Sequence, residues 1–292
     1  MIGPRITQTA ELLKLRISLR DTLADSVSLI ASGPDFSHKY AESSASYFFV
    51  NGSLEHSKYL ERKPSAWLVT FPLLMHGNRV GAPEIEDRKT AIKGCAVDTI
   101  FASSDLSPQE TRDSLSCLSV NYKNLIIVPR QLLREILLGV KPADWLLWSL
   151  GSTQQLARLL NLGTWGQIAR FLVPSRTSPF NGPIPYFWKP SGGVQAALLI
   201  SLIPNLTEIR LTGIAFGDDR YLRRGKIVLT ESKGGHFPID SLVLRRLAHS
   251  SQANWSCTSE STSNRVGIGL YPPDNNFRNG TTDQGSLRND VT

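Results

Sequence analysis

Three short apolar segments, each ended by a polar or Gly/Pro turn, constrain this chain more than any other feature. They are "SVSLIASGP", "SYFFVNGS" and "SAWLVTFP", which end at Ser32-Gly33-Pro34, Asn51-Gly52 and Pro72. Each apolar run has the length of a buried strand and is too short for a helix. The stretches between them are long enough for crossover connections, so they predict a mostly parallel sheet in an α/β fold.

Further apolar runs between Gly and Pro extend this pattern along the chain. We expect strands at "VDTIFAS", "KNLIIVPR", "TEIRLTGIAF" and "ANWSC". We expect helices at residues 10–24, within 131–174, from 191 to about 202, and at "DSLVLRRLAHS", where Asp240 would be the cap. The chain thus divides into an N-terminal amphipathic helix (1–24), one Rossmann-like domain with flanking helices (25–272) and a disordered tail (273–292) with few apolar residues.

The charge balance favours anionic partners. The 292 residues include 32 Lys and Arg against 25 Asp and Glu, which gives a net charge of +7 and a pI near 9.4. Nucleotides, nucleic acid and acidic lipid surfaces all fit that charge. The basic residues are scattered apart from the patch 220–226, so a nucleic-acid interface is disfavoured.

The cysteines and the N-terminus indicate the compartment. Cys95, Cys117 and Cys257 are widely spaced and form no C-x-x-C or Cys/His pattern, so they predict neither a disulfide framework nor a zinc site. The sequence has no signal-peptide pattern and no continuous apolar span. We therefore expect a cytoplasmic protein. Its basic N-terminal helix either attaches it peripherally to the inner membrane or packs against the domain, and a homo-oligomer stays open.

Polar and small residues follow the predicted strands, where ligands bind in open α/β sheets. Ser32 and Gly33 either offer a hydroxyl and an N–H group to a phosphate or ribose, or form only a turn. Asn51 offers donors and an acceptor to a base or sugar, although turn formation by Asn-Gly is the commoner role. Neither G-x-G-x-x-G nor G-x-x-x-x-G-K-[ST] occurs, so an ordinary dinucleotide site and a P-loop are disfavoured.

The segment "KPSGGVQAALLISL" places small residues at the start of an apolar helix. Pro190 disfavours helix at Lys189, so the helix begins close to Ser191. The unpaired N–H groups and partial positive charge of such a helix start suit an anion. In the alternative interpretation, Ser191 is only a helix cap, and Gly192 and Gly193 relieve crowding against the sheet.

His236 has the most distinctive setting of the five histidines. It lies in "SKGGHFPIDS", between a glycine pair and a helix. Because an imidazole titrates near neutral pH, a histidine in this place suits a general base. The nearby Asp218-Asp219 pair could bind a metal ion, but adjacent aspartates are more often solvated loop residues, so we predict no metal site.

In this order, the motifs resemble the bacterial sialyltransferases of glycosyltransferase family 42. The likeness covers residues 26–52 and 185–258 and rests on the Gly-Pro turn, the Asn after the second strand, "SGGVQAALL", "EIRLTGIAF" and the histidine loop. The resemblance implies inverting, metal-independent transfer of sialic acid from CMP-sialic acid to a hydroxyl of a bacterial surface glycan, such as lipooligosaccharide, without a further cofactor. It also implies a GT-A-like variant of the fold with a small lid, here residues 217–236.

Residue roles follow from the same resemblance. His236 is similar to the family's general base. Tyr221 is similar to a tyrosine that stabilises the departing phosphate. Lys189 stands close to a position where the family has an arginine, and the resemblance implies that its charge replaces that arginine in contact with the donor. The residues similar to the family's donor contacts are Ser32, Gly33, Asn51, Ser191 and Gly192.

Other functions stay open because the family carries an asparagine where Ser32 stands and a tyrosine where Gly217 stands. One alternative is a related diphosphokinase of pterin-like substrates or a transferase for another nucleotide sugar. A further alternative is a degenerate protein that keeps the fold and binds a nucleotide without turnover.

Overall fold

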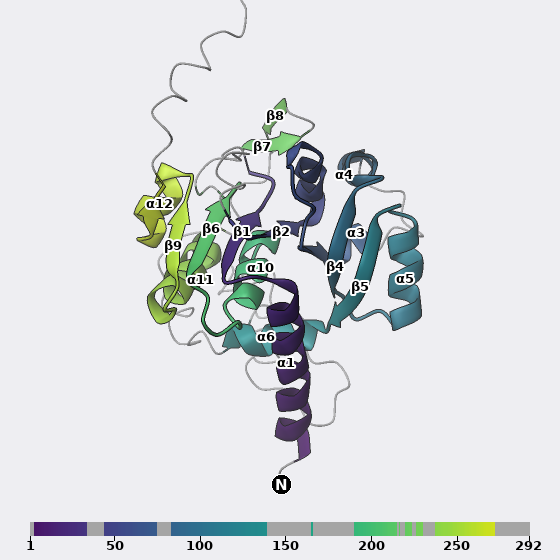
Figure 1. Ribbon diagram of the computed structural model, residues 1–292, viewed down its shortest axis with the longest axis horizontal. Coiled ribbons are helices and arrows are strands. Elements are labelled where there is room, and N and C mark those ends of the chain that lie inside the picture. The colour runs from purple at the N-terminus through teal and green to yellow at the C-terminus, as the bar shows by residue number, and fades with distance from the viewer. Residues whose placement is uncertain are drawn as a thin grey trace, which may run out of the picture.

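One eight-stranded sheet organises the chain in this computed structural model (Figure 1). The strand order is β10-β9-β6-β1-β2-β3-β4-β5, and every neighbouring pair runs parallel. The predicted α/β fold with a mostly parallel sheet is therefore confirmed. The structure describes residues 3–33, 44–74, 83–138, 165, 190–214, 216, 220–223, 226–229 and 237–271.

Seven of the eight strands of this sheet lie where the short apolar segments predict them, and β10 was not predicted. Their bounds are β1 Ser26–Ile30, β2 Ser46–Val50, β3 Ala66–Thr70, β4 Ala96–Ser103, β5 Asn121–Val128, β6 Glu208–Thr212, β9 Asn254–Cys257 and β10 Gly269–Leu270. Successive side chains of a strand point to opposite faces of the sheet. In β2, Phe48 and Phe49 therefore enter different cores, and every residue of this strand is buried.

Helices cover both faces of the sheet. Their bounds are α1 Gly3–Thr22, the 3-10 helix η1 Asn51–Tyr59, α3 Phe71–Leu74, α4 Pro83–Ile92, α5 Pro108–Ser116, α6 Arg130–Leu138, α10 Gly192–Ile200, α11 Phe237–Ser250 and α12 Glu260–Val266. One core contains buried residues of α1, α6, α10 and α11. The other core contains Leu54 of η1, Ile92 of α4 and Leu115 of α5. The sheet is thus a central layer between two helical layers (Figure 1).

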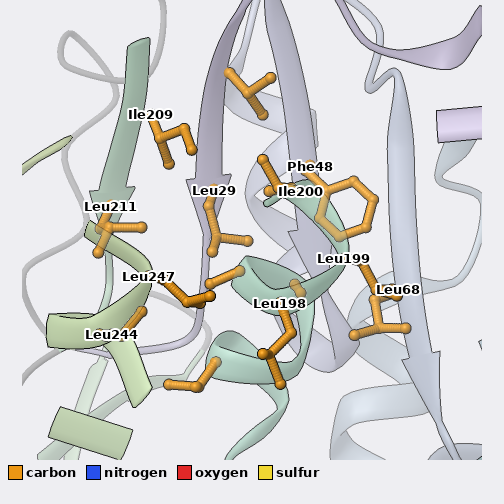
Figure 2. Packing of buried hydrophobic residues seen from close by; sticks show 14 of the residues in the cluster. Leu29, Phe48, Leu68, Leu198, Leu199, Ile200, Ile209, Leu211, Leu244 and Leu247 are labelled. Atoms are coloured by element: carbon orange, nitrogen blue, oxygen red, sulfur yellow. The ribbon is translucent and has the colours of Figure 1, made fainter. Parts of the chain in front are cut away.

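Helix α10 lies against the centre of the sheet (Figure 2). Leu198, Leu199 and Ile200 belong to the same core cluster as Leu29 of β1 and Phe48 of β2. Residues 193–200 of this helix are all buried. Full burial of a leucine or isoleucine side chain contributes roughly 1.5–3 kcal/mol, so this packing fixes where the N-terminus of α10 lies.

The structure corrects two predicted boundaries. Strand β6 ends at Thr212 and does not continue to Phe216, because Gly213 has a left-handed backbone with φ of 70° that no strand accommodates. Helix α11 already begins at Phe237, so Asp240 lies in its first turn and is not its cap.

Part of the predicted lid segment forms a separate antiparallel ribbon. Strand β7 Arg220–Arg223 pairs with β8 Lys226–Leu229. In Figure 1 this ribbon lies beyond the carboxyl ends of the central strands. The tail 273–292, and the helices expected between 139 and 174 apart from the helical residue Trp165, lie outside the described residues.

Helix α1 packs against the domain through the apolar face expected from the sequence. Leu15, Leu19 and Leu23 are buried in the same core as α10, and Leu12 packs against it. Within the described ranges, no helix is long and apolar enough to cross a bilayer.

Candidate functional site

The direction of chain progression reverses at β1, which makes the carboxyl end of this strand the candidate site. After β1 the chain adds β2, β3, β4 and β5 on one side, and later adds β6, β9 and β10 on the other side. Ligands of open α/β sheets bind outside the carboxyl ends of the strands at such a switch point. The predicted residues Ser32, Gly33 and Asn51 follow β1 and β2 at this edge.

Gly33 and Gly213 bring the ends of β1 and β6 into direct backbone contact. The Gly33 N–H donates to the Gly213 carbonyl oxygen at 2.7 Å. A Cβ on Gly33 would lie 2.3 Å from that oxygen, and a Cβ on Gly213 would lie 2.1 Å from the Ala31 oxygen. The absence of a side chain at Gly33 therefore lets the segments after β1 and β6 come together. Ser32, beside it, is half-buried.

Asn51 connects the ends of β2 and β3. Its Oδ1 accepts hydrogen bonds from the Thr70 N–H at 2.9 Å and from the Thr70 hydroxyl at 3.0 Å, and its backbone oxygen accepts from the Trp67 indole at 2.8 Å. Because the Thr70 N–H can only donate, it fixes the orientation of the amide. The Asn51 NH₂ group consequently faces the start of α10, where a Cβ on Gly192 would lie 2.7 Å from Nδ2.

Small residues allow the start of α10 to lie close to the sheet. A Cβ on Gly192 would lie 2.9 Å from Val50 Cγ1, and a Cβ on Gly193 would lie 3.1 Å from Ile214 Cδ1. The helix begins after Ser191, whose carbonyl accepts the Gln195 N–H at 2.9 Å. This close packing agrees with the interpretation that the glycines relieve crowding. It also directs the first N–H groups of α10 toward the carboxyl edge of the sheet.

Asp240 is a buried acid at the start of α10 that the sequence prediction misplaced. The Ser191 N–H donates to its Oδ1 at 2.8 Å, and the residue is only 3% exposed. Burial raises the pKa of the Asp240 carboxyl to about 7, while hydrogen bonds from Ser191 lower it in part. A signal for this burial exists in the sequence, because Asp240 shares the helical phase of the buried Val243, Leu244 and Leu247.

The structure brings Ser32, Gly33, Asn51, Ser191 and Gly192 to one edge of the sheet, and their role as donor contacts stays a prediction. The roles of Tyr221, Lys189 and His236 stay predictions. The backbone of Tyr221 pairs with Val228 in the β7–β8 ribbon, but its side chain is outside the described part of the chain. Lys189 and His236 also lie outside the described residues, as do Asp218 and Asp219.

Among the described residues, no group of three or more His, Cys, Asp or Glu side chains has a geometry that could hold a metal ion. None of the three cysteines, all within the described residues, forms a disulfide bond, and burial raises the pKa of the Cys95 thiol. Comparison of the chain with protein-family models, curated proteins and solved structures finds no match. The fold, the residues at the carboxyl edge and the sequence motifs are therefore the features of this chain that bear on its function.

Proposed function

We propose that the chain is a glycosyltransferase that binds a nucleotide-sugar donor, CMP-sialic acid, at the carboxyl edge of the sheet and transfers the sugar to a hydroxyl of a bacterial surface glycan. The observation that carries this proposal is the contact between the α10 N-terminus and the ends of β1 and β2. A helix N-terminus at the switch point of a parallel sheet is a common phosphate-binding arrangement.

Three kinds of donor at this edge suit the phosphate and ribose of the ligand. The first N–H groups of α10 have no acceptor within the helix, the Asn51 NH₂ group faces them, and the Ser32 hydroxyl belongs to a half-buried residue after β1. A helix N-terminus stabilises an anion by about 0.3–1 kcal/mol when exposed and by up to about 2 kcal/mol when partly buried. Because Gly192 has no side chain, the Asn51 amide can lie next to the first turn of α10.

The chemical step follows the family resemblance. The acceptor oxygen attacks the anomeric carbon of the donor sugar while the bond from that carbon to the phosphate oxygen breaks. The phosphate of CMP keeps the electron pair of the broken bond, and His236 takes the proton of the acceptor hydroxyl. Tyr221 and Lys189 would stabilise the charge that develops on the departing phosphate. No metal ion takes part in this proposal.

Asp240 makes donor binding depend on pH under this proposal. An ionised carboxylate at the Ser191 N–H repels an incoming phosphate, whereas the protonated acid does not. Because the pKa of Asp240 is raised to about 7, CMP-sialic acid should bind more tightly as the pH falls through this value. A second candidate is a degenerate nucleotide-binding protein without turnover, because the family's tyrosine is replaced at Gly217.

The acceptor would be a glycan precursor at the cytoplasmic face of the inner membrane. Peripheral attachment to that membrane is accordingly part of the proposal. The inner apolar face of α1 cannot contact the membrane, because Leu15, Leu19 and Leu23 pack in the core.

The first experiment is a thermal-unfolding panel of CMP, CMP-sialic acid, other nucleotide sugars, and ATP with Mg²⁺. Ligand binding raises the unfolding midpoint by mass action. We expect CMP and CMP-sialic acid at saturation to raise the midpoint by about 5 °C. No rise with either ligand contradicts the proposal, whereas turnover of ATP favours the diphosphokinase.

The second experiment measures CMP release in the presence of a sialylation acceptor. His236→Ala should reduce the release about 100-fold or more through loss of the general base, and EDTA should leave it unchanged. The variant should still show the thermal shift with CMP, since the proposed role of the base is to take a proton from the acceptor hydroxyl. A shift with CMP but no release with any acceptor in the wild type supports the degenerate candidate.

A further inference from the structure

Helix α1 has a second apolar face, on the side opposite to the one that packs in the core. Leu15, Leu19 and Leu23 are at most 6% exposed and form the inner face. Leu13 and Ile17 are 56% and 41% exposed. Side chains four residues apart lie on one side of a helix, so Leu13 and Ile17 form one apolar strip, which the domain does not cover.

Basic residues flank this strip. Arg16 and Arg20 each follow one of the two apolar residues at a spacing of three, which places them beside the strip, and Lys14 lies on its other side. All three are exposed. Asp21, four residues after Ile17, also lies beside the strip, and its Oδ1 is 3.7 Å from Arg20 Nε with both side chains exposed. The three basic residues outnumber this one acid, so the strip keeps a positive border. We call Leu13, Ile17, Lys14, Arg16 and Arg20 the outer face of α1.

The position of α1 makes this face available to a large partner. The C-terminus of α1 leads directly into β1, so the helix lies at the amino edge of the sheet, and its N-terminal half extends beyond the other labelled elements (Figure 1). The candidate ligand site lies at the carboxyl edge, so occupation of the outer face leaves that site free.

The charges beside the strip favour an anionic lipid surface over a second copy of the chain as its partner. A second copy of the chain, packed through Leu13 and Ile17 of both helices, would bring Lys14 close to Lys14 and Arg16 close to Arg16 in an antiparallel pair, and Lys14 close to Arg16 in a parallel pair. Such like-charge contacts are unfavourable. An anionic lipid surface accepts apolar side chains at the acyl boundary and attracts the flanking Lys and Arg, and the net charge of +7 adds to this attraction.

We propose that the outer face of α1 is a docking surface for an anionic lipid bilayer, in which Leu13 and Ile17 insert and Lys14, Arg16 and Arg20 contact lipid headgroups. The binding is reversible, because two inserted side chains and three basic residues give a marginal attachment. The docking surface rests on the peripheral attachment that is part of the proposed function. It uses none of the residues at the carboxyl edge, so a failure of docking and a failure of the transfer reaction are distinguishable.

The test is flotation of the full chain with vesicles of phosphatidylcholine, with or without about one third phosphatidylglycerol. We expect the wild type to bind the anionic vesicles about 10-fold more tightly than the neutral ones and to be released by high salt. Leu13→Gln with Ile17→Gln, and separately Lys14→Gln with Arg16→Gln and Arg20→Gln, should each weaken the binding to anionic vesicles about 10-fold.

The matched control is Leu270→Gln, which changes a leucine of similar exposure, 44%, on β10. It should bind like the wild type, and unchanged circular dichroism should show that all variants are folded. Unchanged binding of the Leu13 and Ile17 double variant would overturn the proposal, as would a wild type that does not bind anionic vesicles. A wild-type dimer that this double variant dissociates would instead assign the strip to a second copy. None of these assays contains a donor sugar, so their failure leaves the proposed transfer reaction untouched.

Discussion

Two glycine pairs lie at the carboxyl edge of the sheet, and they differ in what they contact. Gly33 and Gly213 face backbone atoms, with a missing Cβ at 2.3 and 2.1 Å from a carbonyl oxygen. Gly192 and Gly193 face side chains, with a missing Cβ at 2.7 and 3.1 Å from Asn51 Nδ2 and Ile214 Cδ1. The backbone directly after two paired central strands is held by hydrogen bonds and cannot move aside, whereas the end of a side chain can. The first pair is therefore required by the fold, and the second pair leaves room for a role in binding.

The largest effect is expected from Gly213→Ala. This change combines a left-handed backbone, φ of 70°, with a backbone contact at 2.1 Å, so it should lower the free energy of unfolding by about 4 kcal/mol or more. Gly94→Ala is the matched control, because Gly94 has a φ of 78° but nothing within 4 Å of its missing Cβ. In urea unfolding, Gly94→Ala should lower the free energy of unfolding by only about 1 kcal/mol. Equal losses would mean that the β1–β6 contact is not the cause.

Asp240→Asn should change the free energy of unfolding by a smaller amount than Gly213→Ala, and it should increase it. Because the folded pKa of about 7 lies above the ordinary 3.8, the folded chain binds more protons between these values. Wild-type stability therefore falls as the pH rises from about 4 to about 7. The variant removes this slope. It should be about 2 kcal/mol more stable at about pH 8, since each pKa unit is worth about 1.4 kcal/mol and the loss of an ionised acceptor for the Ser191 N–H offsets part of the gain.

Urea unfolding across this pH range measures the effect of Asp240→Asn. The control is Asp98→Asn, at a surface carboxyl whose pKa is lowered, first of all by its hydrogen bond with Lys63. In the wild type this carboxyl contributes stability above about pH 4 that is lost on acidification, so Asp98→Asn should reduce stability near neutral pH. If both variants change stability in the same direction at about pH 8, the burial of Asp240 is not the dominant influence.

The smallest effect on stability is expected from the second glycine pair. Gly192→Ala should cost about 1 kcal/mol, because the displacement of Asn51 and Val50 outweighs the gain in helix propensity. Gly193→Ala should be nearly neutral, since only the flexible end of Ile214 has to move. The two variants should differ more in ligand binding, measured by the thermal shift with CMP. Gly192→Ala should weaken CMP about 10-fold, and Gly193→Ala should leave it unchanged; equal affinities would remove Gly192 from the proposed site.

The strands of this fold were predictable because their signals are local. "SVSLI", "SYFFV" and "AWLVT" are apolar over the length of a strand and end at Gly, Pro or Asn, which stop a strand through their own backbone preferences. The strand order was not predictable, because it depends on which strands pair after the chain has collapsed. The end of β6 at Thr212 was not predicted either. The apolar residues after Gly213 continue the strand pattern, although the backbone of Gly213 is left-handed.

The candidate site was predictable only in part because its contacts are long-range. Gly33 is recognisable as a position of close approach, but its partner Gly213 is distant in sequence and only the β1–β6 pairing brings the two together. Asp240 next to a helix start looks like a cap in the sequence. Its carboxylate instead binds Ser191 of a different helix, a contact that depends on how α10 and α11 pack.

The hydrogen bonds between Asn51 and Thr70 have a consequence for the chemical ageing of the protein. Asparagine followed by glycine is prone to deamidation, in which the next backbone nitrogen attacks the side-chain amide carbon and ammonia leaves. Two donors from Thr70 hold the Asn51 amide oxygen, which restrains the rotation that this attack requires. Deamidation at this position should therefore be slow in the folded protein and fast after unfolding. Water then opens the cyclic imide to aspartate or isoaspartate, and aspartate carries a second carboxylate oxygen in place of the NH₂ group that faces Gly192. The rate of ammonia loss therefore measures how often this edge opens.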